Sequence, residues 1–304
     1  LEFTSKMNAL DDQIMAMIRK AIEIIGDGKK GPYKALVVHN EAQNFSVGAN
    51  LGLALFALNI GLWPQVEQSI ADGQMTYKAL KYAPFPTVAA PSGMALGGGC
   101  EILLHCSAVQ AHAELYTGLV EVGVGLLPGW GGCKELILRH TANKRRPGGP
   151  MPPLAAAFEA ISTAKVAKSA FEAKEMLILN KDDAITFNKD RLLADAKAKA
   201  LAMAADYKAP EPPKEIRLPG PTAKAALELA VEGFALQGKA TPHDVVVSKA
   251  VASVLSGDKT DITQVLTEDD LYALERKFFM ELVRTTGTID RIEHMLETGK
   301  PLRN

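Results

Sequence analysis

The stretch PSGMALGGGCEILLHC, residues 91–106, decides the fold class of this chain of 304 residues. Three consecutive glycines, Gly97 to Gly99, follow a short apolar run and precede an apolar segment of helical length. Glycines permit a sharp turn and a close approach of the backbone. A helix that starts there presents amides that lack intrahelical acceptors. Such amides can stabilise a developing oxyanion, and a tight turn that binds nothing is the alternative.

Strand and helix patterns alternate around this stretch. Residues 34–39 and 86–91 are short apolar runs that predict buried strands, and residues 108–116 predict another. Apolar positions between 14 and 25 recur at helical spacing, and residues 51–82 predict helices with a break near Pro64. This alternation predicts an α/β fold for the first half of the chain.

The second half reads as mostly helical. Residues 141–153 form a basic insertion rich in proline and glycine, which predicts a surface position. Five prolines mark residues 207–221 as a linker or an extended loop. We therefore predict three regions: a core of residues 1–206, a proline-rich linker of residues 207–221, and a helical C-terminal region of residues 222–304.

Composition excludes several classes of protein. Lysine and arginine total 34, and aspartate and glutamate total 35, so the net charge of −1 argues against a protein that coats nucleic acid. No run of 18 apolar residues occurs, which predicts no membrane span. The chain has three cysteines without a CxxC pair, and its first residues do not resemble a signal peptide. These features are typical of a protein in a reducing compartment, and we predict a cytoplasmic location.

Two carboxylates stand in apolar surroundings. Glu101 occupies the first turn of the expected helix after Gly99, and Glu121 lies within the glycine-rich stretch LVEVGVGLLPG. Two partly desolvated carboxylates suit general acid and base chemistry on a water molecule. The alternative is structural, because the helix dipole stabilises a glutamate such as Glu101 and a partner could neutralise Glu121.

Other site patterns are absent from the sequence. Gly123 and Gly125 are followed by Pro128 where a dinucleotide-binding fingerprint needs its third glycine, and no Walker motif is present. The histidines lack HExxH spacing, and no GxSxG elbow occurs. His105, on the apolar helix, is expected to be a core residue. We predict no metal and no redox cofactor.

Four segments in order resemble the crotonase, or enoyl-CoA hydratase/isomerase, superfamily. They are SKMNALD (residues 5–11), FSVGANL (45–51), the stretch at 91–106, and GLVEVGVGLLPGWGGCKEL (118–136). The resemblance implies a core of ββα repeats arranged as a spiral. It also implies an acyl-CoA thioester substrate, coenzyme A only as part of that substrate, and a homo-oligomer that is a trimer or a dimer of trimers.

The resemblance assigns roles by position. The two amides of the family's oxyanion hole fall on Ala49 and Gly98. The two glutamates of its hydratases fall on Glu101 and Glu121, which keep the spacing of twenty residues. The same motifs imply a set of substrate-binding residues: Phe45, Val47, Asn50, Leu51, Gly97 and Trp130.

Some positions depart from the family pattern. Asn50 replaces the usual aspartate, Val120 replaces a proline before the second glutamate, and Ser92 replaces an asparagine. Trp130 is bulkier than the residue usual in PGxGG and narrows the expected acyl pocket. The change at Val120 puts the local backbone near Glu121 in question, and the change at Asn50 affects the structure of its loop.

The resemblance predicts a 2-enoyl-CoA hydratase of fatty-acid β-oxidation. Two alternatives stay open, a Δ3,Δ2-enoyl-CoA isomerase that works with the later glutamate alone and a non-catalytic module that binds acyl-CoA. The insertion at 141–153 and the long tail after residue 210 suggest the hydratase part of a larger fatty-acid oxidation protein. A 3-hydroxyacyl-CoA dehydrogenase is the partner expected for it, joined covalently or non-covalently.

Overall fold

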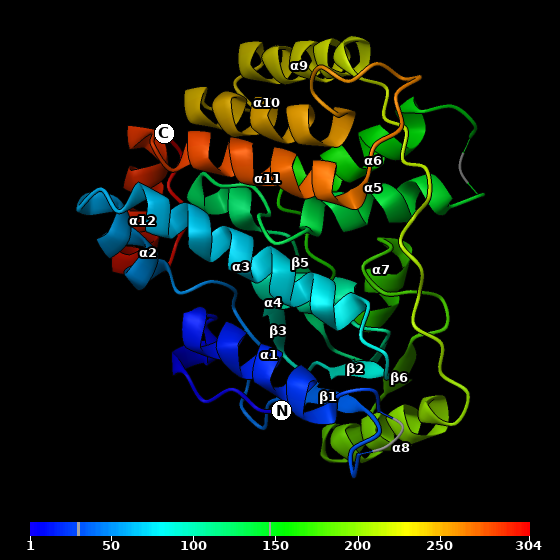
Figure 1. Ribbon diagram of the computed structural model, residues 1–304. Helices are drawn as coiled ribbons and strands as arrows, with labels where there is room; N and C mark the ends of the chain where they lie inside the picture. The colour runs from blue at the N-terminus through cyan, green and yellow to red at the C-terminus, as the bar shows by residue number, and fades with distance from the viewer. Residues whose placement is uncertain (29–30, 146) are drawn as a thin grey trace. The chain divides into compact units, whose positions relative to one another are not determined.

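The computed structural model describes residues 1–28, 31–145 and 147–304 (Figure 1). The chain forms two compact units from interleaved segments. The first unit comprises Leu1–Asn50, Asp72–Gly118 and Val166–Glu211, and the second comprises Leu51–Ala71, Leu119–Lys165 and Pro212–Asn304. The division of the sequence at residues 206 and 221 stays a prediction.

The first unit combines parallel strands with helices, as the alternating sequence pattern predicts. Strands β1, β2, β4 and β6 form one parallel sheet in that order, and β3 pairs in parallel with β5. The strands are β1 (Leu36–His39), β2 (Thr87–Ala90), β3 (Met94–Leu96), β4 (Ala108–His112), β5 (Tyr116–Gly118) and β6 (Ala184–Thr186). The helices of this unit are the 3₁₀ helix η1 (Lys6–Asn8), α1 (Asp12–Ile25), α4 (Gly98–His105), α7 (Ala170–Glu175), the 3₁₀ helix η3 (Lys189–Arg191) and α8 (Leu192–Ala204).

The three strand predictions are confirmed. Strands β1 and β2 lie within the runs at 34–39 and 86–91, and β4 lies within residues 108–116. Strand β5 begins at Tyr116 and belongs to a different sheet from β4. A turn at His112 separates them, because its carbonyl accepts from Leu115 N at 3.0 Å and its Nδ1 accepts from Glu114 N at 3.3 Å.

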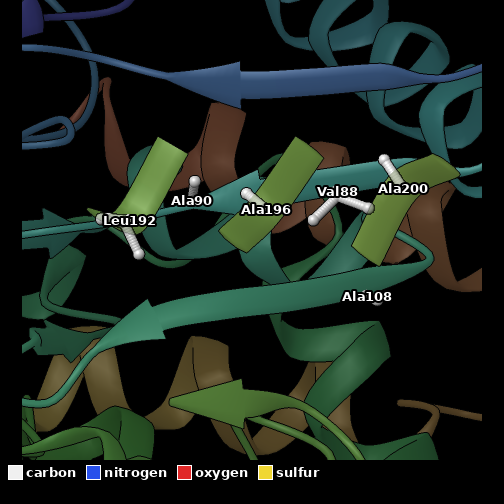
Figure 2. Packing of buried hydrophobic residues seen from close by; sticks show 6 residues of the cluster. All are labelled: Val88, Ala90, Ala108, Leu192, Ala196 and Ala200. Carbon is white, nitrogen blue, oxygen red and sulfur yellow. The ribbon is translucent and has the colours of Figure 1, made fainter. Parts of the chain in front are cut away.

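Small side chains bring α8 close to the main sheet (Figure 2). Ala196 and Ala200 of α8 are buried with Val88 and Ala90 of β2 and complete a cluster with Leu192 and Ala108. Alanine at the contact lets a helix backbone approach a sheet, and burial of the apolar surface stabilises the pair.

Helix α1 forms where the sequence predicts it. Ile14 and Ile18 are buried at helical spacing, and the Asp11 carboxylate accepts from Ile14 N at 2.9 Å, which caps the first turn. Gly26 follows the helix with a φ of 65°, a backbone conformation that favours glycine.

The second unit is helical. It contains α2 (Leu51–Asn59), the 3₁₀ helix η2 (Glu121–Val124), α5 (Gly132–Ala142), α6 (Met151–Ser162), α9 (Pro221–Leu236), α10 (Pro242–Ser256), α11 (Glu268–Leu282) and α12 (Thr286–Thr298). Helix α10 packs between α9 and α11, and it also contacts α5, α6 and η2 (Figure 1). Capping boxes at Thr241 and Thr267 fix the first turns of α10 and α11. The predicted helical C-terminal region is confirmed.

The helices between residues 51 and 82 are interrupted at a different place from the one that Pro64 suggests. Pro64 does not break the helices, because it is the second residue of α3 (Trp63–Lys81), where a missing amide costs no hydrogen bond. The interruption lies at residues 60–62 instead. The insertion at 141–153 comprises the last two residues of α5, the connection to α6 and the first three residues of α6. Arg146 within it is outside the described residues.

Among the helices of the described residues, none is both long and apolar enough to pass through a membrane.

Candidate active site

The turn into α4 lies against the loop that contains Gly48. Gly97 precedes α4 with a φ of 53°, and its amide donates to Gly118 O at 3.0 Å. A Cβ on Gly48 would lie 3.1 Å from Leu96 O and 3.4 Å from Gly98 N. The backbone segments around Gly48 and Gly98 therefore touch, and a side chain at Gly48 would separate them.

Two amides in these adjoining segments are available to a ligand. Within the described part of the chain, the amide nitrogens of Ala49 and Gly98 have no acceptor. The loop is nevertheless fixed on both sides of Ala49, because Leu10 N donates to Gly48 O and Asn50 N donates to Leu10 O, each at 2.8 Å. Ala49 lies in an exposed loop, and Gly98 begins a helix, where amides lack intrahelical acceptors. Both amides can therefore donate to a ligand, which makes this pair a candidate binding site in the first unit.

Two side chains hold this pair of segments, and the sequence patterns do not single them out. The Ser46 hydroxyl donates to Asn8 O at 2.8 Å and accepts from Gly48 N at 3.2 Å. The Tyr77 hydroxyl donates to Gly98 O at 2.9 Å. Ser46 lies within the FSVGANL motif, which marks its neighbourhood, whereas Tyr77 lies in the middle of α3, where no sequence signal marks it.

Glu101 follows directly in the first turn of α4. Its amide donates to Gly97 O at 2.9 Å, and the residue is 1% exposed. Its carbonyl oxygen lies 2.7 Å from His105 Nδ1. His105 is fully buried with its ring 5.5 Å from that of Tyr77, which confirms the prediction that it is a core residue.

Glu121 belongs to the second unit and begins η2. Both of its carboxylate oxygens are shielded from solvent. The turn around it is closed by Gly123 N, which donates to Val120 O at 2.9 Å, and by Leu126 N, which donates to Glu121 O at 3.0 Å. These bonds shape the short 3₁₀ helix η2 within the glycine-rich stretch.

A cluster of charged residues contacts η2 through Arg291, which donates to Val122 O. Arg291 of α12 is buried and pairs with Asp244 of α10 at 2.8 Å. Although burial opposes it, hydrogen bonds from Thr241 and Arg291 lower the pKa of Asp244 below its ordinary value. The pKa of His243 is also lowered, first by burial and then by the Arg291 charge. Arg291 thus remains paired with an ionised carboxylate beside a neutral imidazole.

The loop that carries Trp130 is held by α11. The carboxylate of Glu275, which is fully buried, accepts from Gly131 N and Lys134 N, each at 2.7 Å. It therefore caps α5 from a distant part of the chain. A Cβ on Gly129 would lie 2.9 Å from the Phe279 ring, and Trp130 itself is 7% exposed.

A buried lysine completes this region of the second unit. Lys134 pairs with Glu135 and with Glu268 at 3.0 Å, and its ammonium lies 4.5 Å from the centre of the Tyr272 ring. Burial alone would lower the pKa of Lys134, but the carboxylates outweigh burial and raise it. Lys134 is therefore a cation in a structural ion cluster, which the sequence did not reveal.

The remaining predicted residues are distributed over both units. In the first, Phe45 is buried with its ring 6.5 Å from that of Phe3, and Val47 and Asn50 are half-buried. Leu51 begins α2 of the second unit. Phe45 is thus a core residue of the first unit, and the substrate-binding role assigned to this set stays a prediction.

The cysteines are buried and form no disulfide. Burial raises the pKa of the Cys106 thiol to about 12, which keeps it protonated near neutral pH. In the described residues no three side chains of histidine, cysteine, aspartate or glutamate gather as metal ligands would.

Comparison with known proteins gives a family match and several relatives. Residues 1–145 match the family model described as enoyl-CoA hydratase/isomerase. The chain is 41% identical over 304 residues to a protein of Bacillus subtilis (strain 168) named "Probable 3-hydroxyacyl-CoA dehydrogenase", covering 100% of this chain and 38% of that protein. It is 30% identical over 291 residues to a protein of Rickettsia prowazekii (strain Madrid E) named "Putative fatty acid oxidation complex trifunctional enzyme", covering 95% of this chain and 36% of that one.

The chain thus spans little more than a third of the length of these two relatives. Among solved structures, the crystal structure of enoyl-CoA hydratase from Bacillus halodurans is similar with a TM-score of 0.60 and 16% identity, over 95% of this chain and 91% of that chain. This likeness shows the fold, and with it the crotonase-like spiral core that the motifs imply is confirmed. Residues 1–145 thus form a region that matches the enoyl-CoA hydratase/isomerase, or crotonase, family.

Proposed function

We propose that this chain adds water to 2-enoyl-CoA thioesters, as a hydratase of fatty-acid β-oxidation. The observation that carries the proposal is the arrangement at the start of α4. The amides of Ala49 and Gly98 lie in adjoining backbone segments without an acceptor among the described residues, and the buried Glu101 follows within one helical turn. A pair of oriented amides beside a carboxylate suits a reaction in which an oxyanion forms while a water molecule is activated.

The amides act on the thioester carbonyl. When water adds to C3 of a 2-enoyl-CoA, electron density moves through C2 onto the carbonyl oxygen, which becomes an enolate oxyanion. Donors that are already fixed stabilise this charge more than the neutral carbonyl, so they lower the barrier rather than only tighten binding. The bonds that hold Gly48 and Asn50 to Leu10 fix the Ala49 donor in advance.

The two glutamates divide the handling of protons. Glu101 takes a proton from the water whose oxygen bonds to C3, and Glu121, in its protonated form, gives a proton to C2. The proton held by Glu101 then returns to Glu121 through solvent, which restores both glutamates. The hydroxyl ends at C3 and the hydrogen at C2, so the elements of one water molecule are added. The burial of Glu101 and of the Glu121 carboxylate oxygens supports such roles, because desolvated carboxylates are effective acids and bases near neutral pH.

The metabolic setting follows from the chemistry of the product. A 3-hydroxyacyl-CoA is the substrate of a 3-hydroxyacyl-CoA dehydrogenase, which is the name of the relative from Bacillus subtilis. We propose that such a dehydrogenase is associated with this chain, covalently or not, and that coenzyme A enters only as part of the substrate. A homo-oligomer, as a trimer or a dimer of trimers, and a cytoplasmic location are parts of the same proposal.

Hydration of crotonyl-CoA tests the proposal. The purified chain should remove the ultraviolet absorbance of the conjugated thioester and yield 3-hydroxybutyryl-CoA. Glu101→Gln should abolish this reaction, whereas the matched Glu114→Gln should not, because Glu114 is exposed on the turn after β4. Conversion of a 3-enoyl-CoA to the 2-enoyl-CoA without hydration would instead assign the isomerase. Tight binding of acyl-CoA without turnover of any enoyl-CoA would assign the non-catalytic module.

A further inference from the structure

We propose that Thr288 and Arg291 of α12 are positioning residues for Glu121. They bind the backbone on the C-terminal side of this glutamate and so set the position of its carboxylate. The inference rests on the proposed function for the role of Glu121, but the contacts themselves lie wholly within the second unit. It also gives the C-terminal helices, which lie beyond the residues that match the family, a part in the chemistry.

Thr288 anchors the end of the turn that contains η2. Its side chain is fully buried, and its hydroxyl donates to Gly125 O at 2.7 Å. Because that donation uses the only hydroxyl hydrogen, His243 Nε2 is the donor in its 3.0 Å contact with Thr288 Oγ1. Gly125 adopts a φ of 77°, and a Cβ there would lie 2.8 Å from the Thr288 hydroxyl.

Arg291 anchors the residue next to Glu121. Its Nη1 donates to Val122 O at 3.1 Å, and the side chain is 2% exposed. The other guanidinium nitrogens are held as well, since Nε donates to Asn304 Oδ1 at 2.7 Å and Nη2 donates to Asp244 Oδ1 at 2.8 Å. A planar guanidinium with an acceptor at every nitrogen cannot turn away, so it is a rigid support for Val122.

These two anchors restrain the turn at two carbonyls. Val122 O and Gly125 O lie on either side of Gly123 and Val124, and Glu121 immediately precedes the first anchor. The internal bonds of the turn are accepted by Val120 O, Glu121 O and Val122 O, and they keep its shape but not its place in the unit. The anchors from α12 supply that place. A misplacement of about 1 Å at a catalytic group costs on the order of a hundredfold in rate.

Substitution of Thr288 separates positioning from general stabilisation. Thr288→Val keeps the shape of the side chain and removes the donor to Gly125 O, so we expect kcat for crotonyl-CoA to fall by about tenfold to a hundredfold. KM should stay unchanged, because Glu121 acts on a proton and does not bind the thioester. Thr288→Ser retains the hydroxyl and should restore kcat. Thr298→Val is the matched control on the same helix, since Thr298 donates only to carbonyls at residues 294 and 300.

Arg291→Lys tests the second anchor. Lysine retains the charge beside Asp244 but loses the planar set of donors. We expect kcat to fall again with KM unchanged. The double variant with Thr288→Val should lose less than the product of the two single losses, because both act on one turn. Unchanged kcat in a folded Thr288→Val, or a loss that Thr288→Ser does not restore, would overturn the proposal.

A second measurement is independent of turnover. Hydrogen exchange at the amides of Gly123, Gly125 and Leu126 should accelerate in Thr288→Val and return to the original rate in Thr288→Ser. If the unmodified chain hydrates no enoyl-CoA, the proposed function fails, and this exchange decides on the anchors alone. Unchanged exchange at all three amides in Thr288→Val would refute the positioning role whatever the reaction.

Discussion

The start of α4 and the η2 turn carry the two halves of the proposed chemistry, and they are held in different ways. Neighbouring backbone fixes the start of α4, where Gly97 N donates to Gly118 O and Leu96 N donates to Ser46 O. Side chains that lie 163 and 169 residues further along the chain anchor η2. A group made of backbone amides can be specified by a local motif, whereas the place of a catalytic side chain depends on distant helices.

Gly99 of α4 and Gly123 of η2 differ in the space that surrounds them. A Cβ on Gly99 would lie 2.7 Å from Ser46 O and 2.8 Å from Ser46 Cβ, so only glycine fits there. A Cβ on Gly123 would meet nothing within 4 Å. Gly99 is therefore enclosed by the backbone and side chain of Ser46, whereas Gly123 within η2 has open space around it.

Loss of the Glu121 carboxylate should have the largest effect. In Glu121→Gln the amide cannot exchange the proton at C2, so we expect kcat for crotonyl-CoA to fall by about 10²–10⁴-fold. Circular dichroism and the melting temperature should stay as in the unmodified chain, because the turn bonds around Glu121 involve its backbone. A folded variant with full activity would remove Glu121 from the mechanism. The η2 turn would then carry no part of the proposed chemistry.

Removal of the Gly98 amide should have the next largest effect. Gly98 is the first residue of α4, a position where helices accept proline, as at Pro221 and Pro242 in this chain. Gly98→Pro therefore removes one oxyanion donor without an unsatisfied helix bond. We expect turnover of crotonyl-CoA to fall by about 10²–10³-fold, or roughly 2.7–4 kcal/mol. Activity that survives this change would show that another donor stabilises the oxyanion.

A matched pair of alanine substitutions tests the difference in packing. Gly99→Ala should lower the free energy of unfolding in urea by about 1–3 kcal/mol, because backbone atoms of Ser46 would have to move. Gly123→Ala should raise it by about 0.4–1 kcal/mol, since the site has room and the unfolded chain loses freedom. Equal effects at the two positions would contradict the contrast between the segments.

Acidification should have the smallest effect on the free energy of unfolding, and it should act through His243, which contacts Thr288 next to the η2 turn. Burial and the Arg291 charge lower the pKa of His243 in the folded state, while Asp244 and Asp290 act in the opposite direction. The unfolded state, with a histidine pKa of about 6.5, then binds more protons as the pH falls. The free energy of unfolding should therefore decline from pH 7 to pH 5.

His243→Gln, which cannot take up that proton, should show a shallower decline in melting temperature over the same range. Parallel curves for the two proteins would mean that the environment of His243 does not disfavour its charged form.

The sequence alone was sufficient for what local backbone determines. The strands at 34–39 and 86–91, the glycine turn at 97–99 and the helix from Asp12 to Ile25 follow from apolar spacing, glycine and capping residues within a few positions of each other. The family motifs added Ala49, Gly98 and both glutamates by position. Roles for these residues can be proposed from the motifs, because amides at a helix start and carboxylates in apolar surroundings have predictable chemistry.

Only the tertiary structure revealed what the distant residues do. Thr288, Arg291 and Glu275 stand in amphipathic helices whose apolar stripes predict only core or subunit contacts. Nothing in a helical repeat shows that one buried polar residue will meet a carbonyl far earlier in the chain. The physical reason is that local patterns determine which face of a helix is buried, whereas the partner of a buried donor is determined by how the helices pack.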